Sequence, residues 1–230
     1  ILILPAMGIV SDVIPVFSRK PLFGYAFVIF AGISIAFLGW FVWSHHMFTV
    51  GLGPAANSAF AISTMLIGLP TGVKIFNWIG TMWGGSIKFT TAMWFSIAFM
   101  ALFIVGGLSG VMHAAVPSDA QQQDTYFIVA HFHYTLVGGA LMGIFSGIYF
   151  WWPKAYGFLL NEKLGKANFW LMFIGMNIQF GPMHWLGMDG MPRRIYTYAD
   201  NMGWELSNMA ATLGGFTIAL AVALFIYNVI

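Results

Sequence analysis

The sequence predicts an all-α membrane protein: a polytopic transmembrane helix bundle that forms a single membrane domain over residues 1–230. Of its 230 residues 60% are hydrophobic, and the mean hydropathy is +0.83. Only 7% are charged, against roughly a quarter in ordinary globular proteins. Crossing the hydrocarbon layer takes roughly 20 apolar residues, and apolar stretches of about this length recur along the chain.

Seven apolar segments, separated by charged residues, proline or glycine, are expected to be membrane helices. They are residues 1–16, 23–48, 60–82, 93–116, 126–152, 169–186 and 207–230. We expect the first and last to be incomplete and the chain to be a fragment, because it begins with Ile1 rather than Met and both ends lie inside apolar stretches. Glycine pairs inside the segments suit close helix packing in lipid.

The loops differ in charge between the two sides. Loops after the first, third and fifth segments carry six cations, namely Arg19, Lys20, Lys88, Lys154, Lys163 and Lys166. The other loops carry only Arg193 and Arg194. Because positive loops remain on the cytoplasmic side, we assign the six-cation side as inner.

Composition also excludes several functions. The chain has no cysteine, which rules out disulfides, iron–sulfur clusters and thiolate zinc sites. A metal would be held by histidine, carboxylate, amide or methionine. The net charge is only +2 without a basic run, so no nucleic-acid partner is expected.

Four histidines carry the strongest chemical signal. His45 and His46 end the second segment on its outer side, and both could hold one metal only if the helix end there is distorted, since neighbours on a helix diverge by about 100°. His131 and His133 are about 200° apart on a helix, so they can serve two centres on opposite faces. Histidines that only touch headgroups or neighbouring helices are the alternative, but a group of four in the outer half of a membrane is costly and suggests redox metal.

Lys74 lies about ten residues from the inner end of its segment. Thr71 is three residues earlier and so on the same face. A lysine at this depth is costly. An ion pair would be the plain explanation, but no Asp or Glu is expected in the middle of a segment, so a proton path towards the histidines fits better.

Polar residues of the outer loops are weaker candidates. Asp119 and Asp124 flank three glutamines, and their oxygens suit a hard cation such as Mg²⁺, although a solvated loop fits as well. Arg193 and Arg194 suit carboxylates. His184 and most Trp and Met residues are assigned to packing and interfacial belts.

Together these segments resemble subunit I of the haem-copper terminal oxidases, the cytochrome c and quinol oxidases. The matching strings occur in family order over most of the chain. They are ILILP at 1–5, WSHHMFT at 43–49, PTGVK at 70–74, DTY at 124–126, VAHFHY at 129–134 and GMPRR at 190–194.

The resemblance implies roles for individual residues. His45 and His46 would be two of three copper ligands, His131 the axial ligand of the high-spin haem, and His133 one axial ligand of the low-spin haem. Lys74 and Thr71, with Ser11, would form a proton channel. Asp124 would help to bind Mg²⁺ or Mn²⁺, while Asp119, Arg193 and Arg194 would lie at the haem propionates. The family usually has a histidine where this chain has Gln123, and an amide oxygen can still bind the cation.

The implied function is the reduction of O₂ to water by a respiratory terminal oxidase, coupled to proton translocation, with cytochrome c or quinol as electron donor. Implied cofactors are two haems, a-type first, and copper. Implied partners are subunits II and III and the lipid membrane, with the bacterial cell membrane first and the mitochondrial inner membrane second. The seven segments would be the sixth to twelfth helices of twelve, so the third copper ligand, its tyrosine and the second low-spin haem ligand would lie upstream. This fragment alone should not turn over.

Three alternatives remain open. A nitric oxide reductase of the same superfamily shares the histidines, but Lys74 argues against it. A metal-free, proton-coupled transporter could use Lys74 and the histidines as a relay. A non-catalytic haem-binding membrane subunit is the third.

Overall fold

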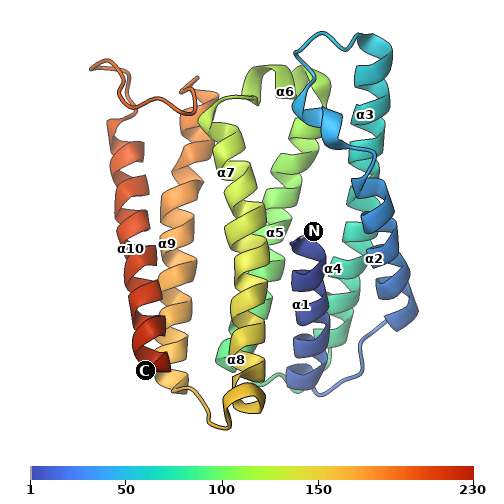
Figure 1. Ribbon diagram of the computed structural model, residues 1–230, viewed down its shortest axis with the longest axis vertical. Helices are drawn as coiled ribbons and strands as arrows, with labels where there is room; N and C mark the ends of the chain where they lie inside the picture. Colours follow the sequence, from blue (N-terminus) through green and yellow to red (C-terminus); the bar gives the residue numbers. More distant parts are fainter. Residues whose placement is uncertain (1) are drawn as a thin grey trace.

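The computed structural model describes residues 2–230 and shows an all-helical bundle whose long helices run up and down side by side (Figure 1). Ile1, the first residue of the first predicted segment, lies outside the described residues. The α-helices are α1 (Ile3–Ser18), α2 (Tyr25–Gly39), α3 (Pro54–Leu66), α4 (Gly68–Met82), α5 (Thr91–Ala114), α6 (Val116–Gln122), α7 (Tyr126–Thr135), α8 (Met142–Tyr156), α9 (Glu162–Met188) and α10 (Glu205–Val229). Two short helices of other types are η1 (Trp43–His46), a 3₁₀ turn, and η2 (Leu136–Leu141), a π-helix.

The seven predicted segments all appear as helices in the predicted order. Four continuous stretches are long and apolar enough to cross a membrane, namely α3–α4, α5, α7–η2–α8 and α10. The helices α1 and α2 are apolar but shorter, and α9 is long, with 27 residues. The chain is therefore a polytopic membrane protein, as the composition predicted.

The predicted second segment, residues 23–48, is wrong at its outer end because α2 stops at Gly39. The following residues are tied to α3 instead. Ser63 Oγ donates to the carbonyl of Phe41, and Asn57 Nδ2 donates to the carbonyl of Phe48. Hydrogen bonds to a neighbouring helix thus replace the helical ones, and the chain turns through η1.

A break between α3 and α4 falls at Ile67. Pro70 has no N–H with which to bond the carbonyl of Leu66 four residues earlier, so the helical ladder is interrupted there. Ile67 N bonds instead to Thr64 O, three residues back. The break therefore lies one turn before Pro70, at the start of the helix that carries Lys74.

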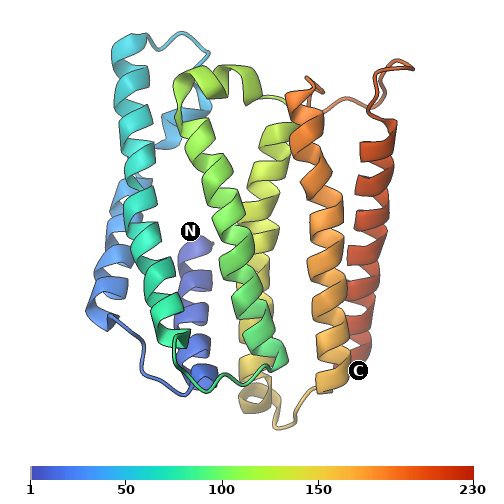
Figure 2. The same cartoon turned by 180° about the vertical axis from the view of Figure 1, so that it is seen from behind.

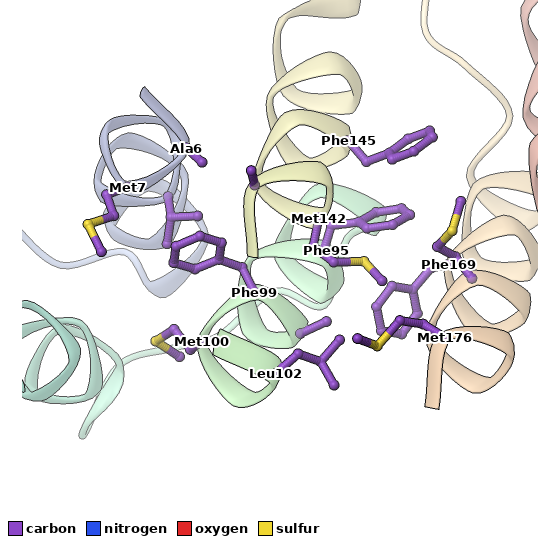
Figure 3. Close-up of a cluster of buried hydrophobic side chains, with 14 of the residues drawn as sticks. Ala6, Met7, Phe95, Phe99, Met100, Leu102, Met142, Phe145, Phe169 and Met176 are labelled. Carbon is purple, nitrogen blue, oxygen red and sulfur yellow. The ribbon is translucent and has the colours of Figure 1, made fainter. Parts of the chain in front are cut away.

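The main apolar core lies where α1, α5, α8 and α9 meet (Figure 3). Phe95 and Phe99 of α5 are fully buried, as are Met142 of α8 and Met176 of α9. Phe95 stacks on Phe145 with ring centroids 5.2 Å apart. In lipid, where apolar burial drives little association, such contacts act through close packing.

Small residues bring α5 and the π-helix together in this core. A Cβ atom added to Gly138 of η2 would lie 2.7 Å from Leu102 Cβ of α5. Only glycine allows this approach without moving a backbone. The contact fixes the helix that carries His131 and His133 against α5.

The two ends of the bundle differ (Figures 1 and 2). At one end lie η1, α6 and the loop from 189 to 204, and at the other lie the loops that join α1 to α2, α4 to α5 and α8 to α9. The second end carries the six cations of the predicted inner side. An isolated antiparallel bridge between Thr125 and Pro192 ties the outer loops together.

Candidate functional site

Three of the four singled-out histidines line one cavity near the outer end of the bundle. His45 and His46 come from η1, and His131 comes from α7. The cavity has a volume of about 200 Å³ and is walled mostly by α5 and α7, with smaller contributions from α3 and α4. A second cavity of about 450 Å³ shares the same three histidines and extends towards Asp124 and Arg193.

The side chains of His45 and His46 face each other. Their Nε2 atoms are 3.0 Å apart and their ring centroids 4.2 Å apart. Imidazole nitrogens bound to one metal lie about 2.0–2.1 Å from it, which places two such nitrogens roughly 3 Å apart. The pair therefore fits a shared metal ion, and the 3₁₀ turn of η1 supplies the distorted helix end that sequence reasoning required.

The hydrogen bonds on the Nδ1 side of His45 place the lone pair of this ring on Nε2, the atom that faces His46. The Thr64 hydroxyl donates its proton to Phe60 O over 2.6 Å. Thr64 therefore accepts from His45 Nδ1, 3.2 Å away. With Nδ1 carrying the proton, Nε2 presents its lone pair, which is how partners behind a ligand orient metal-binding histidines.

His131 and His133 leave α7 in different directions. His131 Nδ1 donates to Gly106 O over 2.9 Å and contacts Ser109 Oγ at 3.0 Å. His133 Nδ1 donates to Val129 O over 2.8 Å, and its ring stacks on Phe180 of α9 at 4.0 Å. Because carbonyls only accept, both rings carry a lone pair on Nε2. His131 lines the cavity, whereas the face of the His133 ring packs against α9.

Within residues 2–230 no group of three or more His, Cys, Asp or Glu side chains is arranged to hold a metal ion. The histidines therefore offer a pair on η1 and two single ligands on α7. A pair needs further ligands from outside these residues or from solvent to complete a copper site, while a single imidazole suffices on one face of a haem iron.

Lys74 and Thr71 lie between two cavities. Thr71 lines the histidine cavity. Lys74, only 6% exposed, lines another cavity of about 500 Å³ together with Ser11 and Asp12 of α1. Its Nζ is so close to α2 that a Cβ added to Gly32 would lie 3.1 Å away. Ser11 accepts from the Trp78 indole over 3.0 Å and donates to Met7 O over 2.7 Å.

The outer polar residues are only partly brought together. Asp119 lines both histidine cavities, and Asp124 and Arg193 line the larger one. Arg193 binds Asp124 Oδ1 through Nη2 at 2.7 Å and Nε at 2.9 Å. Arg194 is exposed and lines neither cavity. Gln123 donates to Thr49 rather than pairing with Asp124.

Sequence reasoning missed two residues near these sites. His113, at the end of α5, is buried in the wall of the histidine cavity. Asp12 shares the cavity of Lys74, although no carboxylate was expected at mid-depth. His113 stands in an apolar run with no lysine or arginine beside it. A histidine in such a run needs a buried partner, and this was the signal in the sequence.

A bundle of apolar helices with a histidine-lined cavity near one end defines a polytopic membrane protein with a candidate functional site inside the membrane. The family described as Cytochrome C and Quinol oxidase polypeptide I matches residues 1–217. The chain belongs to this family, subunit I of the haem-copper oxidases, which the resemblance predicted.

Individual relatives agree with this assignment. The chain is 54% identical over 230 residues to cytochrome c oxidase subunit 1 of Bacillus sp. strain PS3, covering 100% of the chain and 37% of that protein. It is 48% identical over 229 residues to quinol oxidase subunit 1 of Bacillus spizizenii, covering 100% of the chain and 35% of the relative. The chain thus spans little more than a third of these relatives.

A solved structure shows the same fold. It is a heme-copper terminal oxidase dimer, which superposes with a TM-score of 0.81 at 20% identity. The match covers 90% of this chain and 42% of that chain. At this identity the likeness supports the helix arrangement alone.

Proposed function

We propose that the chain is part of the catalytic subunit of an aerobic respiratory terminal oxidase that reduces O₂ to water and couples this to proton translocation. The observation that carries the proposal is the joint cavity of His45, His46 and His131, with His133 on another side of the same helix. Among the relatives are both cytochrome c and quinol oxidases. Cytochrome c is the first choice of donor, since the more similar of these two relatives uses that name.

The histidines would hold the cofactors through their Nε2 nitrogens. His45 and His46 would bind copper through Nε2, and His131 would bind the iron of a high-spin haem. His133 would bind a low-spin haem on the α9 side. When bound, haem iron and copper supply the O₂-binding position and the electrons for its reduction. The haems are expected to be a-type.

The protein around these ligands fixes their direction. Gly106 O and Ser109 hold the His131 ring from α5, and Thr64 holds the His45 ring from α3. Each ring is held by a helix other than the one that carries it, so packing of the bundle sets the geometry of the centre. Such preorganisation keeps the ligands in place when the oxidation state changes.

Protons would reach the centre from the inner side through Ser11, Lys74 and Thr71. Lys74 is the buried cation between the cavity that contains Ser11 and the cavity that contains the histidines. The Lys74 amine can take up a proton on the side of Ser11 and release it towards Thr71, which lies one turn earlier in α4. Among the described residues no hydrogen bond or ion pair holds the amine, which leaves it free to exchange protons.

The outer polar residues would serve the charged groups of the site. Asp119, Arg193 and Arg194 would lie at the haem propionates. Asp124 would contribute an oxygen to Mg²⁺ or Mn²⁺, using the oxygen that Arg193 does not bind.

The chain would correspond to the sixth through twelfth helices of a twelve-helix subunit, in one membrane domain. The missing copper ligand, tyrosine and low-spin haem ligand would come from the remaining part of the subunit. Subunits II and III would be its partners, and the bacterial cell membrane its location.

The experiment is a reduced-minus-oxidised and carbon-monoxide difference spectrum of the full-length parent protein, with metal analysis of the same sample. We expect two haems, one of which binds carbon monoxide, and copper. His131→Ala should remove the carbon-monoxide-binding haem, His133→Ala the low-spin haem, and His45→Ala the copper. His184→Ala, outside both histidine cavities, is the matched control and should retain all three.

Absence of haem from the parent would refute the proposal and favour the metal-free transporter. Retention of every cofactor in the His131→Ala variant would refute the ligand assignment alone.

A further inference from the structure

A buried histidine in the cavity wall has no part in the proposed function. His113 is the second-last residue of α5 and is 6% exposed. Its Nδ1 lies 3.2 Å from Oδ1 of Asp119 in α6, which is 3% exposed. Both side chains line the smaller cavity together with His45, His46 and His131.

The direction of this hydrogen bond follows from chemistry. A carboxylate oxygen accepts, so His113 Nδ1–H donates. No other hydrogen bond to the Asp119 carboxylate occurs among residues 2–230, and its Oδ2 is buried without a partner. Within the described part of the chain, the hydrogen bond from His113 alone therefore offsets the cost of burying the Asp119 carboxylate.

Two buried atoms of the pair remain unpaired. They are His113 Nε2 and Asp119 Oδ2. Buried polar atoms usually have partners, and here both belong to residues of a cavity wall. Each of these atoms can therefore accommodate one further polar partner beyond the described residues.

The ring of His113 also contacts the proposed iron ligand. It lies 5.1 Å from the His131 ring, measured between centroids, at an angle of 57°. On its other side it meets Phe127 edge-on at 5.3 Å. Phe127 in turn meets His184 at 5.1 Å, so His113 and His184 flank the same phenylalanine.

We propose that His113 is a positioning residue of the redox centre: it holds the Asp119 carboxylate in the cavity wall, facing the group that His131 binds. The inference rests on the proposed function. A carboxylate fixed at this place adds a negative charge within a poorly solvated site, where charges act strongly on each other. Its position therefore influences how readily the neighbouring haem takes up an electron.

The test is a redox titration of the high-spin haem in the full-length holoenzyme, followed by its absorption spectrum. His113→Phe keeps the ring and its packing but removes the N–H donor. His113→Asn removes the ring but keeps an N–H group near the position of Nδ1. His184→Asn on the other side of Phe127 is the matched control.

We expect His113→Phe to shift the midpoint potential in the same direction as Asp119→Asn. The double variant should match Asp119→Asn alone, since the two residues act through one hydrogen bond. His113→Asn and His184→Asn should retain the parental potential. The iron–histidine stretching band is expected to follow the same pattern, because displacement of the pair alters the surroundings of His131.

Several results would overturn the inference. One is an unchanged midpoint potential in His113→Phe, and another is additive shifts in the double variant. A third is a shift in His113→Asn alone, which would indicate that the ring acts by packing. Loss of the high-spin haem from both His113 variants would likewise show a role in folding only. A parent without haem would refute the proposed function and this inference together, whereas a haem-loaded parent with an unshifted variant refutes only the inference.

Discussion

Replacing Gly138 by alanine should weaken the contact between α5 and the π-helix. The added Cβ would lie 2.7 Å from Leu102 Cβ, whereas ordinary contact begins at 3.4 Å. Leu102 Cβ is attached to the backbone, so no rotation relieves the clash and α5 must move by about 0.7 Å. Overpacking of this kind costs about 1–3 kcal/mol, which lowers the folding equilibrium constant about 5- to 150-fold.

The assay is unfolding of the full-length parent protein in mixed micelles with increasing sodium dodecyl sulfate, followed by circular dichroism. Gly72→Ala is the matched control, because a Cβ added to Gly72 in α4 meets nothing within 4 Å. Alanine there should be neutral or stabilise the helix by up to about 1 kcal/mol. Equal unfolding curves for the two variants would refute the argument that close approach at Gly138 holds the bundle together.

Three further predictions follow from buried and charged side chains. Lys74→Met should slow reduction of the high-spin haem in stopped-flow experiments and leave the haem spectra intact. Lys88 is an exposed inner lysine, so Lys88→Met should change neither the rate nor the spectra. Unchanged turnover in Lys74→Met would refute the proton path. Ser96→Ala removes its 2.7 Å bond to Ser146, whose hydroxyl keeps its bond to Ala92 O, and should destabilise the bundle by about 0.6 kcal/mol, at most about 1.7, in the same unfolding assay; an unchanged unfolding curve would contradict this pairing. Arg193→Ala breaks a partly exposed ion pair and should cost less than about 1 kcal/mol, a loss that shrinks as salt is added; a loss that is independent of salt would argue against an ion pair.

The number and order of the apolar segments could be predicted from the sequence because apolar length is a local property of the chain. The end of α2 could not. Residues 40–48 are as apolar as a helix end in lipid, and only their hydrogen bonds to Asn57 and Ser63 show that they leave the helix. These partners are 9 and 22 residues away in the chain, so no local pattern reveals them.

The site divides in the same way. That His131 and His133 point in different directions follows from helix geometry alone. The inclusion of His45 and His46 in the cavity of His131 depends on the packing of α3, α5 and α7. The pairing of His113 with Asp119 was missed because it depends on how α6 folds back after Ala115, which residue types do not specify.

The placement of His131 and His133 on one helix, two residues apart, has a consequence for electron transfer under the proposed function. The separation of the two haems would be set by the covalent chain and would stay almost constant as side chains and loops fluctuate. Relatives could then adjust the reaction only through driving force, by altering what surrounds each iron. In this chain those surroundings are Gly106 and Ser109 on one side and the Phe180 ring on the other.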